Sequence, residues 1–203
     1  MITSMRNALT AAALAAVAIL GAAASASATP ITYVHTGSGS GTLDQVSFGA
    51  LAPVAFTITA TGDTANVQSC GGSCLFNDNL SASITIAGVG TFNFTTPTRF
   101  FAAATIVGFS RAGVLGSDLF NGPALAAWDM TSSIGPILGT GLLLQWGLSP
   151  VLTDGGTLFF NEGLSDATFT ATVGAQVPEP MTLWLVAMAL LLAFGIARRR
   201  INA

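Results

Sequence analysis

Apolar residues alternate with threonine or serine in three stretches of this chain, and this period of two constrains its fold more than any other feature. In residues 54–61 apolar side chains occupy every second position, and threonine fills most of the others. Residues 81–86 and 166–173 repeat the pattern. Because successive side chains of a β-strand point to opposite faces, each stretch predicts a strand with one buried and one solvated face.

Shorter apolar runs predict further strands around Tyr33 and over 46–48, 106–109, 142–148 and 158–160. Residues 87–90 predict a hairpin turn that leads into Phe92 and Phe94. Stretches rich in glycine and proline predict the other turns, at 37–41, 71–72, 113–123, 135–136 and 154–156. No stretch shows a long, capped amphipathic helix of comparable clarity. We therefore expect an all-β domain, a single antiparallel β-sandwich of jelly-roll type.

The first 28 residues have the three parts of a secretory signal peptide. Arg6 provides the positive charge, residues 8–24 form an apolar run, and Ala26 and Ala28 are the small residues that signal peptidase requires. We expect cleavage to leave Thr29 as the new N-terminus. An uncleaved membrane anchor is the competing interpretation.

A second apolar segment lies at the other end of the chain. Residues 181–197 carry no charge. At 1.5 Å per residue a helix of this length covers roughly 25 Å, close to the ~30 Å hydrocarbon core of a bilayer. The segment is followed by three arginines that stay on the cytoplasmic side, Arg198, Arg199 and Arg200. We expect one transmembrane helix over 181–197, with the bulk of the chain outside.

The residues just before this helix are Val177, Pro178, Glu179 and Pro180. Proline fixes φ and disfavours helix at the residue before it, so we expect an extended strip that a protease can bind. The order of Pro-Glu-Pro, apolar helix and terminal arginines resembles the C-terminal sorting signal of the PEP-CTERM family, and Thr182 and Leu183 match the family's pattern after the tripeptide. The resemblance covers residues 177–203 only.

This resemblance implies where the protein goes. The chain is similar to proteins that bacteria with two membranes export and that an exosortase processes. It therefore implies two processing enzymes, signal peptidase and an exosortase, and a transient membrane anchor before release to the cell surface or the extracellular space. It also implies association with exopolysaccharide or biofilm. A plain single-span anchor with a stop-transfer cluster is the competing interpretation.

Residues 29–176 remain when both ends are set aside, and 148 residues suffice for one domain with a sizeable core. This segment has eight carboxylates, two arginines and no lysine, hence a net charge of −6. Such a surface argues against nucleic-acid binding, which needs a basic footprint. The hydrophobic fraction of 51% is raised by the two ends and does not indicate a polytopic membrane protein.

The two cysteines of the chain, Cys70 and Cys74, are expected to form a disulfide. The signal peptide sends them to an oxidising compartment. The Gly-Gly-Ser spacer leaves the backbone free to bring the two Cβ atoms together. A disulfide that closes so short a loop contributes about 2 kcal/mol to the free energy of unfolding. A redox or metal site is the alternative, but the motif lacks a second cysteine pair and a nearby histidine.

Residue types suited to catalysis are sparse. His35 is the only histidine, and its position beside a glycine-rich stretch predicts a surface or edge-strand residue rather than part of a catalytic triad. Glu162, the only glutamate of the domain, and Asp129 would have to meet in space to act as a glycosidase pair. Asp78 between two asparagines, and Asp154 in its glycine turn, offer oxygen ligands to calcium, yet the EF-hand spacing is missing. We expect no catalytic residue, no cofactor and no metal.

Threonines of matching parity predict hydroxyl rows on one outward sheet face, at Thr57, Thr59, Thr61, Thr85, Thr91, Thr95, Thr168, Thr170 and Thr172. Such a face would meet ordered water, a polysaccharide or a neighbouring subunit. The simpler interpretation is that threonine is a good strand former that tolerates solvent. Few aromatic residues are suited to stacking on sugars, namely Tyr33, Trp128 and Trp146. Trp128, beside Asp129, is the best candidate for an exposed one, although an indole is more often buried in the core of a sandwich.

Two functions from different classes follow. The first is a non-catalytic structural or adhesive protein, exported and delivered to the cell surface or the extracellular matrix. The second is an extracellular module that binds or hydrolyses glycans.

Overall fold

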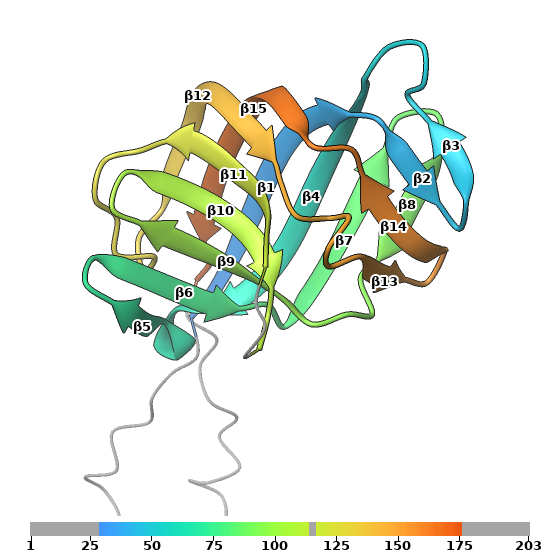
Figure 1. Ribbon diagram of the computed structural model, residues 1–203. Coiled ribbons are helices and arrows are strands. Elements are labelled where there is room, and N and C mark those ends of the chain that lie inside the picture. Colours follow the sequence, from blue (N-terminus) through green and yellow to red (C-terminus); the bar gives the residue numbers. More distant parts are fainter. Residues whose placement is uncertain (1–28, 114–116, 176–203) are drawn as a thin grey trace, which may run out of the picture. The chain divides into compact units, whose positions relative to one another are not determined.

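The structure is a computed structural model that describes residues 29–113 and 117–175. These residues belong to one compact unit with a hydrophobic core of its own side chains. They form fifteen β-strands and one short 3₁₀ turn, η1 (Thr64–Asn66), and no α-helix occurs among them (Figure 1). The expected all-β class is confirmed.

Eleven strands make one antiparallel sheet in the order β5-β6-β9-β10-β11-β12-β15-β1-β4-β7-β8. Their bounds are β1 Pro30–Gly39, β4 Val54–Asp63, β5 Gln68–Gly71, β6 Cys74–Asp78, β7 Ser81–Ile86, β8 Gly90–Asn93, β9 Thr98–Ala103, β10 Ile106–Arg111, β11 Asp118–Ala124, β12 Ile134–Leu143 and β15 Gly163–Val173. A second sheet has the order β13-β14-β2-β3. Its strands are β2 Gly41–Leu43, β3 Val46–Phe48, β13 Val151–Thr153 and β14 Gly156–Phe160.

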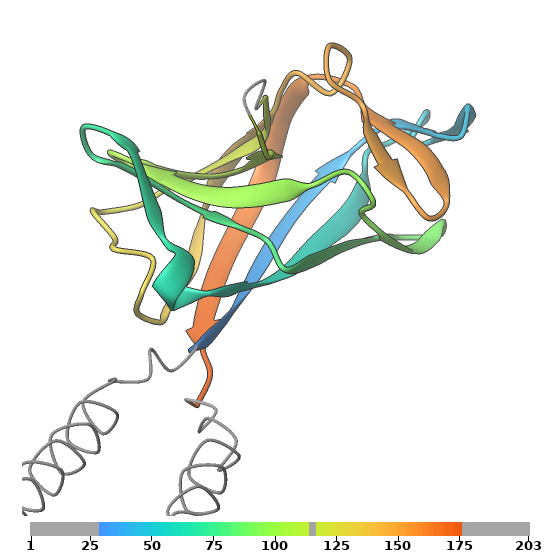
Figure 2. The ribbon, with the colours of Figure 1, turned by 90° about the horizontal axis from the view of Figure 1, so that it is seen from below.

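The large sheet curls until its two halves face each other over one core (Figures 1 and 2). Ring contacts join the halves: the centroid of Tyr33 on β1 lies 4.8 Å from that of Phe100 on β9. Phe56 on β4 lies 5.2 Å from Phe120 on β11. The packing is therefore sandwich-like, although the two layers belong to one continuous sheet.

The strands predicted from alternation are present with the predicted parity. In β4 the side chains of Phe56, Ile58 and Ala60 are buried, while the threonines between them are partly exposed. β7 and β15 follow the same pattern. The predicted hairpin at 87–90 joins β7 to β8, and the Val89 N–H donates to the Ile86 carbonyl at 3.0 Å.

The glycine-rich segment 37–41 is not the turn that we expected. Gly37 and Gly39 lie within β1, and Gly41 begins β2. A Cβ on Gly37 would lie 2.7 Å from Cζ of both Phe56 and Phe120. Glycine is needed here because large aromatic rings occupy the space of a side chain, not because the chain turns.

Two further glycine-proline pairs lie inside strands rather than in loops. Gly122-Pro123 is in β11 and Gly135-Pro136 is in β12. Both sit at register irregularities, and Gly122 and Gly135 have φ of 107° and 101°. They are β-bulges, in which one strand has an extra residue, and glycine accommodates the positive φ that the bulge requires. The expected strand over 142–148 is also wrong in extent, because β12 ends at Leu143.

No helix among the described residues is long and apolar enough to cross a membrane. The predicted signal peptide, with Ala26 and Ala28, lies outside the described residues. So do the Pro-Glu-Pro segment, the helix expected over 181–197, and the arginine cluster 198–200.

Candidate functional site

His35 lies in the core, contrary to our expectation of a surface or edge position. β1 runs between β15 and β4, and the His35 side chain is fully buried. Its ring stacks on Phe120 with centroids 4.2 Å apart, and the rings of Phe100 and Phe169 lie within 6 Å. The signal was present in the sequence, because His35 has the parity of the buried Ile31.

The surroundings of His35 suit packing rather than catalysis. Neither ring nitrogen has a hydrogen-bond partner of good geometry among the described residues. Burial lowers the pKa of His35 to about 3, and the nearby backbone of Gly122 offsets only part of this shift. The imidazole is therefore neutral near pH 7. Its close neighbours are three aromatic rings rather than a nucleophile and a carboxylate.

The two carboxylates considered as a glycosidase pair lie far apart. Asp129 follows Trp128, whose ring packs on Phe169 of β15 at 5.6 Å. Glu162 lies just before β15 begins, and seven residues of strand between 162 and 169 span about 23 Å. Catalytic pairs in glycosidases are about 5–9.5 Å apart. Asp129 instead accepts hydrogen bonds from the Thr131 N–H and Ser132 Oγ, which lower its pKa.

The side chains considered as calcium ligands point in different directions and bind other groups of the protein. Asn77 is buried and donates to the Tyr33 hydroxyl at 2.9 Å, while Asp78 points to the opposite face and pairs with Arg99 at 2.9 Å. Asn79 donates to Thr98 Oγ1. Asp154 accepts from Asn93 at 2.7 Å. Within residues 29–113 and 117–175 no three His, Cys, Asp or Glu side chains are grouped as a metal site would require.

Cys70 and Cys74 form the expected disulfide, with Cα atoms 5.2 Å apart. It closes the hairpin between β5 and β6 at one edge of the large sheet. The disulfide therefore staples an edge hairpin, where few other contacts hold the chain.

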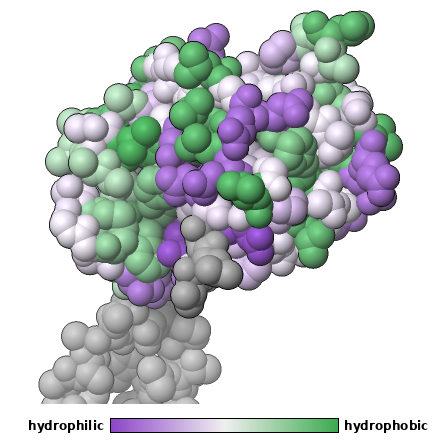
Figure 3. Space-filling view, in the orientation of Figure 1, coloured by the Kyte–Doolittle hydropathy of each residue, from purple (hydrophilic) through white to green (hydrophobic). Residues whose placement is uncertain are grey.

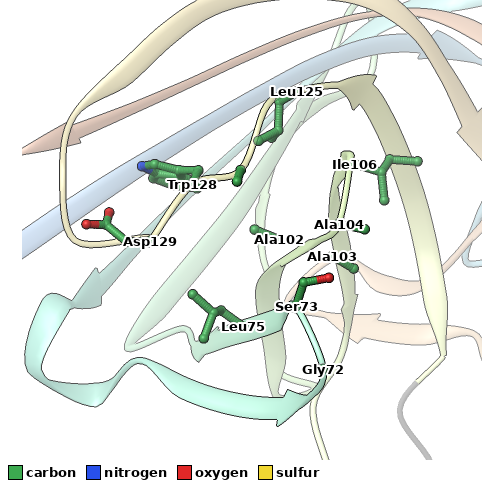
Figure 4. Close-up of a pocket in the computed structure, with 11 residues that line it drawn as sticks. Gly72, Ser73, Leu75, Ala102, Ala103, Ala104, Ile106, Leu125, Trp128 and Asp129 are labelled. Carbon is green, nitrogen blue, oxygen red and sulfur yellow. The ribbon is translucent and has the colours of Figure 1, made fainter.

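A hollow of about 420 Å³ is lined by the ends of β6, β9 and β10 and by the segment around Trp128 (Figure 4). Its walls are mostly apolar, with Leu75, Ala102 and Leu125 among them, and the Asp129 carboxylate points away from its centre. Trp128 is only 8% exposed, and its indole N–H donates to the Ser132 carbonyl at 3.0 Å. Of the two alternatives for Trp128, the structure shows the buried indole, which presents little ring surface to a sugar.

A smaller hollow of about 280 Å³ lies on the other side of the same strands. Both arginines of the domain line it, which the sequence did not suggest. Arg99 pairs with Asp78 and its guanidinium lies 4.3 Å from the ring centroid of Phe76. Arg111 donates to the Pro150 carbonyl at 3.4 Å. Both cations already have protein partners, so the arginines of this hollow have a structural role in holding neighbouring segments together.

The face presented in Figure 3 mixes hydrophilic and hydrophobic residues across the strands at the front.

The rows of hydroxyls predicted on the outer sheet face are present, and they extend further than predicted. Strand register places Thr168, Thr36, Thr57, Thr85 and Thr91 in one row across five strands. We call fourteen outward positions in the middle of these strands the threonine face: Thr168, Thr170, Thr172, Thr32, Val34, Thr36, Thr57, Thr59, Thr61, Ser81, Ser83, Thr85, Thr91 and Asn93. Thr95 lies beyond β8 and is not part of it.

None of these fourteen side chains is charged, but carboxylates border them: Asp166 and Asp63 are the next outward residues of β15 and β4, and Asn93 donates to Asp154. Neighbouring strands lie about 4.8 Å apart and rows follow at about 6.7 Å along each strand, so the face covers roughly 19 Å by 13 Å. Hydroxyls of adjacent strands bond to one another in places, as in Thr61 to Ser81 at 2.7 Å and Thr85 to Thr91 at 2.8 Å. β1 contributes Thr32 and Thr36 between β15 and β4, and the sequence pattern did not predict this contribution.

Comparison of the chain with protein-family models, curated proteins and solved structures finds no match.

Proposed function

We propose that this chain is an exported, non-catalytic protein with a structural or adhesive role at the cell surface or in the extracellular matrix. In this proposal residues 1–28 direct export, and residues 177–203 hold the protein in the membrane until an exosortase cleaves near Pro178 to Pro180. The observation that carries the structural role is the threonine face, a broad array of hydroxyls with carboxylates only at its border, in a domain whose net charge is −6.

The partner that best fits the threonine face is an uncharged polysaccharide. A hydroxyl both donates and accepts a hydrogen bond, so it can pair with sugar hydroxyls in either sense. β-branched side chains have few χ1 rotamers, so little side-chain entropy is lost on contact. Each contact is weak, and repetition along a polymer supplies avidity.

The positions of the chain ends support attachment by a tail. β1 begins and β15 ends at the same end of the sheet, where Ile31 pairs with Val173 and the Gly174 N–H donates to the Pro30 carbonyl at 2.8 Å. β15 is hydrogen-bonded on both sides, to β12 and to β1. A pull on the tail would therefore be opposed by two ladders at once.

Within this proposal the curled sheet is a variant of the antiparallel sandwich of jelly-roll type, with its two layers joined through β11 and β12. The alternative of a glycan-hydrolysing module gains no support from Asp129 and Glu162, because Trp128, next to Asp129, packs on Phe169 in the middle of β15, whereas Glu162 precedes its first residue. Glycan binding without hydrolysis remains compatible with the threonine face.

The proposal is tested in the bacterium that makes this protein, by recovering the chain from the culture medium, the cell-surface matrix and the membranes. We expect most of it in the matrix or medium, with an intact mass that begins at Thr29 and lacks residues 181–203. A chain that accumulates in membranes with its end at Ala203 would contradict the proposed processing.

A further inference from the structure

The first described residue is held at a carboxylate. The backbone nitrogen of Thr29 lies 3.3 Å from Oδ1 of Asp63, and the Thr29 carbonyl accepts from the Thr64 N–H at 3.0 Å. Both main-chain groups of Thr29 are therefore engaged at the junction between β4 and η1. The chain is fixed at the position where the signal peptide is expected to be removed.

Asp63 itself is held in place by the fold. The same Oδ1 accepts from the Ala65 N–H at 2.9 Å and so caps η1. The Asp63 carbonyl accepts from Nδ2 of Asn77 at 3.0 Å. That amide also donates to the hydroxyl of Tyr33, whose side chain is fully buried. The backbone of Asp63 is thus tied to the core and its carboxylate to η1, so the carboxylate is already in place when an N-terminus arrives.

We propose that Asp63 is the binding site for the new α-ammonium group of the mature protein. This inference rests on the proposed export of the chain. Hydrolysis of the Ala28–Thr29 bond adds one water, leaves the carboxylate on Ala28 and gives Thr29 an amine that takes up a proton. A neutral N–H donor then becomes a cation beside a carboxylate, and a charge-assisted hydrogen bond is roughly twice as strong as a neutral one.

The two arginines of the domain do not compete for this carboxylate. Arg99 is paired with Asp78, and Arg111 contacts the Pro150 carbonyl. Next to the pair, the Gly174 N–H donates to Pro30, so the same corner also holds the end of β15. Removal of the signal peptide would thus stabilise the corner at which both ends leave the domain.

A thermodynamic cycle on the compact unit tests this site. Residues 29–175 are released from a fusion partner with a free Thr29 amine, and they are compared with the same domain acetylated at Thr29. Each is made with Asp63 and with Asp63→Asn, which keeps an oxygen to cap η1. We expect acetylation to lower Tm by about 2–4 °C with Asp63 and to leave it unchanged with Asn at this position.

Equal effects of acetylation in both backgrounds would overturn the proposal. If Asp63→Asn does not fold, salt supplies the second comparison within the unsubstituted domain. The Tm difference between free and acetylated forms should shrink in 1 M salt, where the Debye length is about 3 Å. A difference that is independent of salt would also overturn it. An exported protein that starts at another residue would refute the proposed cleavage before Thr29 and hence the role of Asp63 in the mature protein. The thermodynamic cycle tests separately whether Asp63 binds a free Thr29 amine.

Discussion

The two faces of β1, β4 and β15 differ sharply although they share the same backbone. Inward positions carry aromatic and aliphatic side chains that are fully or almost fully buried, such as Tyr33, Phe56 and Phe169. Outward positions one residue away carry threonine in regular rows. The comparison indicates that the inner face determines stability, while the outer face is free to serve a partner.

The largest expected effect is on the inner face. The Phe169 ring contacts those of Tyr33, His35, Phe100 and Trp128 at centroid distances of 5.6–6.4 Å. We expect Phe169→Ala to reduce the free energy of unfolding by about 3–5 kcal/mol, because it leaves a cavity between the layers. The matched outer substitution Thr170→Ala should cost less than about 1 kcal/mol. Urea unfolding of both variants measures the difference, and similar losses would contradict the comparison.

The inner face should also make stability depend on pH. The pKa of His35 is lowered to about 3 in the folded protein, so the unfolded chain binds more protons between that pH and its ordinary value of 6.5. Stability should therefore fall as pH decreases through this window, by roughly 1.4 kcal/mol for each pH unit. His35→Leu should remove this part of the slope. An unchanged slope in this variant would show that other groups cause it.

A third prediction concerns close packing at a glycine. Gly37→Ala would place a Cβ 2.7 Å from the rings of Phe56 and Phe120, and we expect a loss of about 1–3 kcal/mol. Gly163→Ala is the matched control in β15, since a Cβ added there would have nothing within 4 Å and the φ of Gly163 is not positive. Thermal unfolding of the pair should separate them. Equal stabilities would mean that the rings move aside without cost.

Alternation was sufficient to locate β4, β7 and β15 and to identify which of their faces is buried. The position of His35 was missed because the glycines after it indicated a turn, whereas they make room for rings contributed by β4 and β11. The bulge at Gly135 likewise depends on β15, a strand distant in sequence, whereas the bulge at Gly122 faces the preceding strand β10.

The threonine face was predicted only in part. Its parity is local, but the row that joins Thr168 to Thr91 depends on the register of five strands. Arg99 and Arg111 lie near one hollow because β9 and β10 pair as a hairpin, with Arg99 opposite Ser110 and Arg111 opposite Thr98, and this register was not predicted.

The most direct test of the central claim is co-sedimentation of the protein with matrix polysaccharide isolated from the bacterium that makes it. Two hydroxyls in the middle row of the threonine face are removed by Thr59→Val with Thr170→Val, and they are retained by Thr59→Ser with Thr170→Ser. We predict about tenfold weaker binding for the valine pair, from about 1 kcal/mol per lost hydrogen bond partly offset by hydration, and near-normal binding for the serine pair. Equal binding of all three proteins, with the fold intact, would contradict the claim that this face holds the polysaccharide.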